Sequence, residues 1–292
     1  MKRIISAGAS VVLLTGLVAI LPTSSTATAA PRPSASCGDK VLKANGRAWK
    51  CTFADEFSGT SIDSRKWIGL TTAKSGLKGN GDCWVDTPNN VAVGDGVLKL
   101  TTRKEPAPIT CTTNTGTTFE TEYTSGAVST FGKFDQAFGR WEIRARFPQI
   151  TNVGSQSALW LYPRELKYGA ASGEIDIAEF YSKYPDRVVP YIHYSTATSD
   201  ASVTNNYCMV SDPWNFHRYS VEWLVGRITI AIDGAVCVDH RIDPASPLVA
   251  PQPFDHPYTT NLMQSLGVGT NSRDDATPLP LTTEVDWVHV WS

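Results

Sequence analysis

The amino-acid sequence predicts an all-β protein, a jelly roll or sandwich of two curved antiparallel sheets. Several short segments alternate apolar and polar residues with a period of two, and turn residues such as Asp-Gly stand between them. Helical periodicity is hard to find beyond the N-terminal leader. A sandwich of two curved sheets has a concave face, where an aromatic-lined groove can hold an extended polymer.

The alternation identifies individual strands along the chain. Residues 91–93 and 98–100 flank Gly94-Asp95-Gly96, and residues 228–232 lead into Asp233-Gly234, so both regions predict hairpins. Outside these hairpins the alternating sets are Trp141, Ile143, Ala145 and Phe147, then Tyr219, Val221 and Trp223, and finally Val285, Trp287, His289 and Trp291. Because Trp141 lies on the apolar side of its strand, we expect it in the core.

The N-terminal residues have the features of a secretory signal peptide. Lys2 and Arg3 are followed by an apolar run over residues 11–21, and Ala27-Thr28-Ala29 fits the small-x-small cleavage rule. Residues 1–29 are therefore predicted to be removed, which leaves a secreted, extracellular protein with no membrane attachment. The alternative is a retained signal anchor, but the apolar run is shorter than the roughly 20 residues that span a bilayer.

After the signal peptide, residues 30–36 are expected to form a short Pro/Ser leader. Residues 37–292 contain no low-complexity linker, charge run or repeat, so they predict one domain, and we expect a monomer. The 26 basic and 28 acidic residues give a net charge of −2, which argues against a nucleic-acid partner. Only 18% of residues are charged while nine are Trp and ten are Tyr, which favours a neutral, stackable ligand such as a sugar.

The six cysteines all follow the predicted cleavage site. An even number of cysteines in an exported chain indicates disulfides. Several pairings are formally allowed, and we favour sequential pairing because it closes short loops. A zinc site is disfavoured because the sequence has no Cys-x-x-Cys and no histidines cluster with the cysteines. The predicted pairs are Cys37–Cys51, Cys83–Cys111 and Cys208–Cys237.

The segment most informative about function is Gly-Glu-Ile-Asp-Ile-Ala-Glu-Phe, residues 173–180. In a strand, Glu174 and Asp176 lie on one face and the isoleucines on the other. Strict alternation would place Ala178 on the acidic face, but a β-bulge at Ile177 or Ala178 would return Glu179 to it. Three acids on one face raise one another's pKa, so that one holds a proton near neutral pH. A glycosidase needs one such acid beside an ionised carboxylate.

Other interpretations of this segment are a surface strand with solvated acids, a helix and a calcium site. Residues 158–162 and 188–194 are apolar and strand-like, so the segment is predicted to be a central strand, where acids need partners or a function. Spacings of two and three do not place all three acids on one helical face. Clustered carboxylates also suit Ca²⁺, so the residues alone leave catalysis and calcium binding open.

The same segment resembles the catalytic signature of glycoside hydrolase family 16, Glu-x-Asp-x-x-Glu in its bulged form. Other segments resemble that family in the same order along the chain, and laminarinase-like members of exported bacterial enzymes are the most similar. These segments are residues 53–57 with 66–67, 89–98, 138–144, 216–223 and 285–288.

The resemblance implies a concanavalin A-like β-jelly roll with a concave catalytic groove. It also implies hydrolysis with retention of configuration and without a cofactor, with Glu174 as the nucleophile, Asp176 as its assistant and Glu179 as the acid/base. The expected substrate is a β-linked polysaccharide, first β-1,3-glucan of the laminarin type. Alternatives are hydrolysis or transglycosylation of another β-linked polymer, such as mixed-linkage glucan or galactan, and a non-catalytic sugar-binding jelly roll.

Several contacts to the polysaccharide are implied by the same resemblance. Trp160 matches the aromatic floor near the cut site, although a strand tryptophan is as often part of the core. His193 matches a histidine on the following strand, with a buried core histidine as the alternative. Asn90 and Arg103 are expected on the non-reducing side, and Gln264 falls near a position where many relatives carry Asn.

The family resemblance also implies a structural calcium ion far from the groove. Glu56, Gly96 and Asp286 match the positions of its ligands. Oxygen ligands of this kind suit Ca²⁺, so the sequence predicts a structural Ca²⁺ site at these three residues.

Overall fold

The computed structural model describes residues 36–197 and 208–292. The predicted signal peptide, residues 1–29, and nearly all of the predicted leader lie outside the described residues. The described residues form one compact unit. Among the described residues, the helices are a single turn, α1 (Thr72–Ser75), and short 3₁₀ turns, and none is long and apolar enough to cross a membrane.

Alternating residues form the strands that the sequence predicts, and strands dominate the described part of the chain. Their bounds are β1 (Cys51–Asp55), β2 (Ile68–Gly69), β3 (Cys83–Trp84), β4 (Val91–Gly94), β5 (Val97–Thr112), β6 (Thr118–Ser129), β7 (Gly139–Arg146), β8 (Ser155–Pro163), β9 (Glu174–Tyr181), β10 (Arg187–His193), β11 (Cys208–Met209), β12 (His217–Leu224), β13 (Arg227–Ile232), β14 (Ala235–Arg241), β15 (Tyr258–Leu266) and β16 (Leu281–Trp291). The predicted hairpins are confirmed as β4–β5 and β13–β14.

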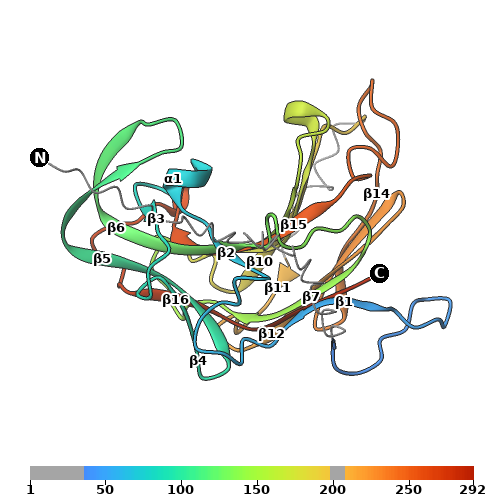
Figure 1. The fold of residues 1–292 in the computed structure, drawn as a ribbon, viewed down its shortest axis with the longest axis horizontal. Coiled ribbons are helices and arrows are strands. Elements are labelled where there is room, and N and C mark those ends of the chain that lie inside the picture. The colour runs from blue at the N-terminus through green and yellow to red at the C-terminus, as the bar shows by residue number, and fades with distance from the viewer. Residues whose placement is uncertain (1–35, 198–207) are drawn as a thin grey trace, which may run out of the picture. The chain divides into compact units, whose positions relative to one another are not determined.

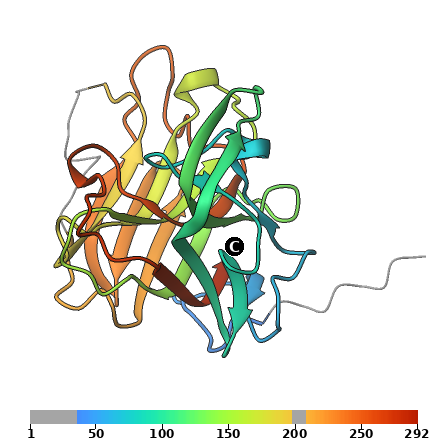
Figure 2. The ribbon, with the colours of Figure 1, turned by 90° about the vertical axis from the view of Figure 1, so that its left-hand side faces the viewer.

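The strands form two layers joined by one long hairpin. One layer has the order β11-β10-β9-β8-β15-β6, and the other has the order β5-β16-β7-β12-β13-β14. The outer halves of β5 and β6 pair with each other, so the hydrogen-bonded path runs without a break from one layer to the other. This hairpin lies at the left of Figure 1 and faces the viewer in Figure 2. The predicted all-β jelly roll is confirmed, with its two sheets continuous at one side.

The core lies between the two layers and takes one face of each strand. β7 shows the pattern most clearly, because its residues alternate between buried and half-buried along its whole length. Trp141 is fully buried and stacks on Trp223 of β12, with ring centroids 5.8 Å apart, so its predicted core position is confirmed. Phe147 stacks on Phe180 of β9 at 5.3 Å, which connects the two layers directly.

The predicted alternation of β16 is wrong in its second half. The pairing of β16 with β7 shifts by one residue between Val285 and Trp287, so the strand carries a bulge there. Val288 and Val290, not Trp287, therefore join Val285 in the main core. Trp291 packs instead in a separate cluster with buried residues of the N-terminal segment.

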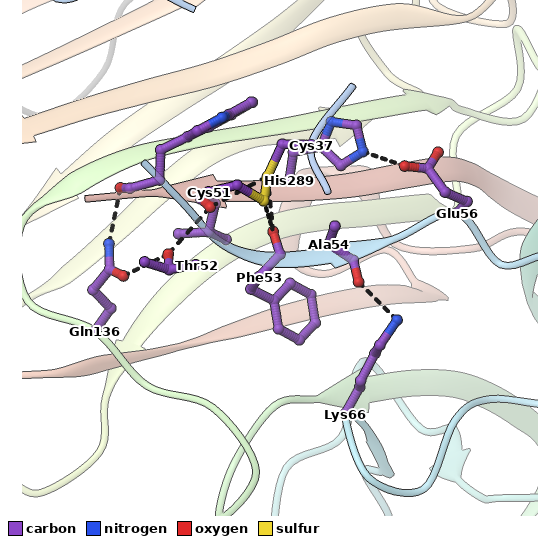
Figure 3. Close-up of a disulfide and its surroundings, with 11 residues drawn as sticks. Cys37, Cys51, Thr52, Phe53, Ala54, Glu56, Lys66, Gln136 and His289 are labelled. Atoms are coloured by element: carbon purple, nitrogen blue, oxygen red, sulfur yellow. Dashed lines mark hydrogen bonds and ion pairs between the residues drawn. A yellow bond between two sulfur atoms is a disulfide. The ribbon is translucent and has the colours of Figure 1, made fainter. Parts of the chain in front are cut away.

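The three predicted disulfides are confirmed, and no cysteine of the described residues is free. The first holds the N-terminal segment against β1 and β16 (Figure 3). Beside it, the Thr52 hydroxyl donates to Gln136 Oε1 at 2.8 Å and Gln136 Nε2 donates to the Trp291 carbonyl at 3.0 Å. The other two bridges connect β3 to β5 and β11 to β14.

Two of these disulfides close loops of nearly equal length and form a matched pair for a stability test. Cys83–Cys111 and Cys208–Cys237 span 28 and 29 residues. If the bridges act by restricting the unfolded chain, replacing either pair by serine should lower the free energy of unfolding by a similar amount, about 3.6 kcal/mol. Urea unfolding of the two double variants measures this. A loss confined to one variant would contradict the entropic explanation.

Candidate active site

The bulge predicted in the acidic strand is present at Ile177. β9 lies between β8 and β10, so it is a central strand. In its pairing with β8, Asp176 lies opposite Trp160 while Ala178 lies opposite Leu159, so β9 has one residue more than β8 at this point. The pairing of β9 with β10 shifts at the same place. The bulge therefore reverses the alternation after Asp176, as the sequence predicts.

The two faces of β9 are consequently different in character. Ile175, Ile177, Ala178 and Phe180 are fully buried in the core between the layers. Glu174, Asp176, Glu179 and Tyr181 lie on the other face, which we call the acid face. Side chains of β8 and β10 that lie opposite these residues share the acid face. From β8 they are Gln156, Ala158 and Trp160, and from β10 they are Val189, Tyr191 and His193.

Burial raises the pKa of all three acids, and repulsion between carboxylates adds to the shift for Glu174 and Asp176. Burial, with the nearby Asp176 carboxylate, raises the pKa of Glu174 from 4.5 to about 8. Burial and the charge of Glu179 raise the pKa of Asp176 well above its ordinary value. Burial also raises the pKa of Glu179, although hydrogen bonds from Tyr181 and Gln156 oppose the shift. Because the carboxyls interact strongly, their protons belong to the set rather than to single residues.

His193 lies directly beside the acids. It is opposite Glu174 in the strand register, and its Nε2 is 2.9 Å from Asp176 Oδ2. Its ring stacks on Tyr191 with centroids 3.6 Å apart. The side chain is 45% exposed, so the alternative of a buried core histidine is wrong. Burial lowers the His193 pKa while Glu174 and Glu179 oppose that shift, so the imidazole can move protons with the carboxyl set.

Trp160 lies on the acid face and not in the core between the layers. It is 7% exposed and belongs to a separate apolar cluster with Trp84 of β3, Ala127 of β6, Ala158 and Met263 of β15. This cluster forms the floor next to Asp176. Its position agrees with an aromatic floor, and contact with a sugar stays a prediction.

Gln264 corrects one of the predicted substrate contacts. Its side chain is fully buried, and its Oε1 accepts hydrogen bonds of 2.8 Å from Ser157 and from Thr283 of the opposite layer. The prediction is wrong because Gln264 shares the core face of β15 with Leu262 and Leu266. Met263 is the neighbour that lies on the acid face.

Asn90 and Arg103 were both predicted to contact substrate on the non-reducing side, and the structure places them differently. Asn90 is 1% exposed, and its Nδ2 donates to the Thr101 carbonyl and the Thr124 hydroxyl, both at 3.0 Å. Its amide therefore joins β4, β5 and β6, and the prediction that it contacts substrate is wrong. Arg103 is one-third exposed, with Nε 3.5 Å from Glu105 Oε1, and its contact with substrate stays a prediction.

Two of the three residues predicted to bind calcium have other partners in this structure, and calcium binding stays a prediction. The Asp286 carboxylate pairs with the Arg144 guanidinium, and the Glu56 carboxylate bonds to His289 (Figure 3). Gly96 lies in the β4–β5 turn and offers only its main chain. Over residues 36–197 and 208–292, no three His, Cys, Asp or Glu side chains lie together in a way that could hold a metal ion.

Two functional neighbours of Glu179 were not predicted from the sequence. The Tyr181 hydroxyl donates to Glu179 Oε1 at 2.7 Å, and Gln156 Nε2 donates to the same oxygen at 3.1 Å. Alternation beyond the bulge places Tyr181 on the face of Glu179, so the position of Tyr181 could have been predicted from the sequence. The contact of Gln156 with Glu179 could not have been predicted, because it depends on the register between β8 and β9.

Comparison with known proteins identifies the family. A model described as glycosyl hydrolases family 16 matches residues 79–289. Glucan endo-1,3-β-glucosidase A1 of Niallia circulans is 30% identical over 263 residues, which are 81% of this chain and 37% of that protein. The β-glucanase of Rhodothermus marinus is also 30% identical, over 83% of this chain and 85% of that protein. The chain belongs to glycosyl hydrolase family 16, which confirms the predicted family and enzyme class.

A solved structure of the same family agrees in fold. It is a non-specific endo-β-1,3(4)-glucanase co-crystallised with a glucan oligosaccharide, which is presented at its active site. The sequences are 28% identical and the TM-score is 0.70, over 86% of this chain and 96% of that one. This chain therefore shares its overall fold with a relative that presents a glucan oligosaccharide at its active site.

The raised pKa of Glu174 predicts a pH-dependent gain of stability when the charge is removed. The folded state keeps this proton up to a pH of about 8, whereas the ordinary value is 4.5, so ionisation opposes folding increasingly across that window. Glu174→Gln should therefore raise the Tm at pH 8 by several degrees and leave it nearly unchanged at pH 4. Calorimetry across this range tests the sign, and a variant less stable than wild type at pH 8 would contradict it.

Proposed function

We propose that this protein is a secreted, retaining endo-glycoside hydrolase that cleaves β-linked polysaccharide, with β-1,3-glucan of the laminarin type as its substrate. The observation that carries the proposal is the bulge in β9, which gathers one buried and two half-buried carboxyls with raised pKa values on one face of a central strand. Placement on one strand favours the close carboxyl spacing of about 5–5.5 Å that retaining enzymes use. The names of the relatives in the same family support a glucan as the substrate.

In the first step, Glu174 acts in the ionised form of the set, in which Asp176 and Glu179 hold the protons, and attacks the anomeric carbon from the face opposite the leaving oxygen. Glu179 donates its proton to that oxygen as the bond to the leaving sugar breaks, and a covalent glycosyl-enzyme ester remains on Glu174. In the second step, Glu179 takes a proton from water, which attacks the anomeric carbon and releases Glu174. Two inversions retain the configuration, and no cofactor takes part.

Asp176 is proposed as the assistant of Glu174 in this cycle. Its carboxyl is buried beside the other two and contacts His193 at 2.9 Å. As the charge on Glu174 is consumed by ester formation, the repulsion between Glu174 and Asp176 falls. Asp176 can then pass its proton to His193, whose Nε2 is 2.9 Å from Asp176 Oδ2, and take it back when Glu174 is set free. Its replacement by Asn should cost less turnover than loss of Glu174.

Contacts with the polymer are proposed for Trp160, His193 and Arg103. Trp160 supplies a flat apolar surface beside Asp176, on which a sugar ring can stack. His193 is 45% exposed next to the acids, so a hydroxyl group of the sugar can reach its ring. Arg103 lies on β5, in the hairpin that joins the two layers, and is a contact further along the polymer.

The alternatives differ in substrate or in catalysis. Family membership is compatible with hydrolysis or transglycosylation of another β-linked polymer, such as mixed-linkage glucan or galactan, and sizing the products from these polymers separates the cases. A non-catalytic sugar-binding jelly roll is less well supported, because a binder has no need of three neighbouring acids whose ionisation opposes folding.

We also propose that residues 1–29 are a signal peptide, that residues 30–36 are a leader and that residues 37–292 are the catalytic domain of an extracellular monomer. The three disulfides support an oxidising compartment. The slightly negative net charge of −2 gives no support to a nucleic-acid partner. The chain spans 37% of the first curated relative, so its activity and partners are inferred from its own site.

Azide rescue of two alanine variants tests the catalytic roles. In Glu174→Ala the nucleophile is missing, so azide should attack an activated β-glycoside directly and give an α-glycosyl azide. In Glu179→Ala the nucleophile remains, so azide should open the covalent intermediate and give a β-glycosyl azide. Both variants should lose several orders of magnitude of turnover on glucan. NMR of the products reports the anomeric configuration.

The control for this experiment is Glu56→Gln, which changes an exposed acid of the other layer. It should turn over glucan like the wild type and form no glycosyl azide. Azide products with exchanged configurations would reverse the two roles. Near-wild-type activity in either alanine variant would refute the catalytic assignment.

A further inference from the structure

The carboxyl of Glu179 is held by one of its two oxygens. Oε1 accepts a hydrogen bond from the Tyr181 hydroxyl at 2.7 Å and another from Gln156 Nε2 at 3.1 Å. Gln156 Nε2 also lies 3.3 Å from the Tyr181 oxygen, so the two donors contact each other as well. These three side chains form a closed group at one end of the acid face.

The strand register places both donors beside Glu179. Gln156 lies directly opposite Tyr181 in the pairing of β8 with β9, and Ala158 lies opposite Glu179. The small Ala158 side chain leaves room for Glu179 to extend along the sheet toward the donors. Gln156 is 8% exposed, so its amide has little access to water and its bonds within the protein are strong.

Both donors keep their hydrogens throughout the working range of pH. An amide does not titrate, and burial together with the charge of Glu179 raises the pKa of Tyr181 far above its ordinary value. An oxygen that accepts two such hydrogen bonds has no lone pair left to hold a proton. The proton of the Glu179 carboxyl is therefore held on Oε2, the oxygen that the donors leave open.

We propose that Tyr181 and Gln156 are positioning residues that bind Glu179 through Oε1, so that Oε2 alone delivers the proton to the leaving oxygen and later takes one from water. The proposal rests on the acid/base role of Glu179 proposed above. It adds two residues that act through Glu179, and it assigns separate functions to the two oxygens of one carboxyl.

The two donors also adjust the acidity of Glu179. Burial raises its pKa, whereas the hydrogen bonds from Tyr181 and Gln156 lower it. The other titratable groups on β8, β9 and β10 are Tyr162, Glu174, Asp176, Arg187, Tyr191 and His193. A residue that first donates and then accepts a proton works best with a pKa near the operating pH. Without the donors, Glu179 would hold its proton more tightly and would be a weaker acid.

Tyr181→Phe and Gln156→Met remove the donors singly and keep the size of each side chain. Each variant is assayed on laminarin and on a 2,4-dinitrophenyl β-glycoside, whose leaving group needs no proton. We expect kcat/KM on laminarin to fall by about tenfold or more, with little change on the activated glycoside. The alkaline limb of the pH profile on laminarin should move to higher pH, because it reports the acid.

Tyr168→Phe is the matched control, because Tyr168 also donates its hydroxyl to a carboxylate, Asp255 Oδ2, at 2.6 Å. It should leave the ratio of the two activities and the alkaline limb unchanged. If both donor variants lose activity equally on the two substrates and the limb does not move, the positioning role is refuted. Unchanged kinetics in both donor variants would refute it too.

Glu179→Gln distinguishes this proposal from the one on which it rests. If it retains activity on laminarin, the acid/base role itself fails. If it is inactive on laminarin but retains activity on the dinitrophenyl glycoside, the acid/base role stands, and the donor variants alone decide the positioning role. Two separate variants are used so that the failure of one to fold leaves the other as a complete test.

Discussion

The single extra residue in β9 is the constraint on which the rest of the site depends. Because Ile177 interrupts the two-residue alternation, Glu179 returns to the face that already carries Glu174 and Asp176. Without the bulge, Ala178 would take that place and Glu179 would point into the apolar core, at a high cost in free energy. The bulge also shifts the pairing of β9 with β8 by one residue. In this register Gln156 lies close enough to donate a hydrogen bond to Glu179.

The acid face destabilises the fold, and the opposite face of the same strand compensates for it. Every one of the three carboxyls has a raised pKa, so its ionisation opposes folding at neutral pH. On the core side, Ile175 and Phe180 are fully buried, and Phe180 stacks on Phe147 of the other layer. A fully buried side chain of this size contributes about 1.5–3 kcal/mol, so β9 keeps its central place despite the charge it carries.

Much of this arrangement follows from local patterns, and the exceptions share one cause. The bulge in β9 was predictable because strict alternation would place the acid Glu179 on the apolar face of the strand. The bulge in β16 was not, since Trp287 is apolar and fits either face. Gln264 was placed on the wrong face of β15 by resemblance, although its apolar neighbours two residues away on both sides are core residues. Contacts between strands, such as Gln156 with Glu179, depend on register, which no single segment encodes.

The central claim is that burial and proximity keep protons on these carboxyls near neutral pH. ¹³C NMR titration of protein labelled at the Asp and Glu side-chain carboxyls measures this directly, with Glu174→Gln and Asp176→Asn for assignment. We expect Glu174 to titrate at about 8 and to move to lower pH in Asp176→Asn, with Asp176 and Glu179 above their ordinary values. Titration of all three carboxyls at about pH 4 would contradict the account.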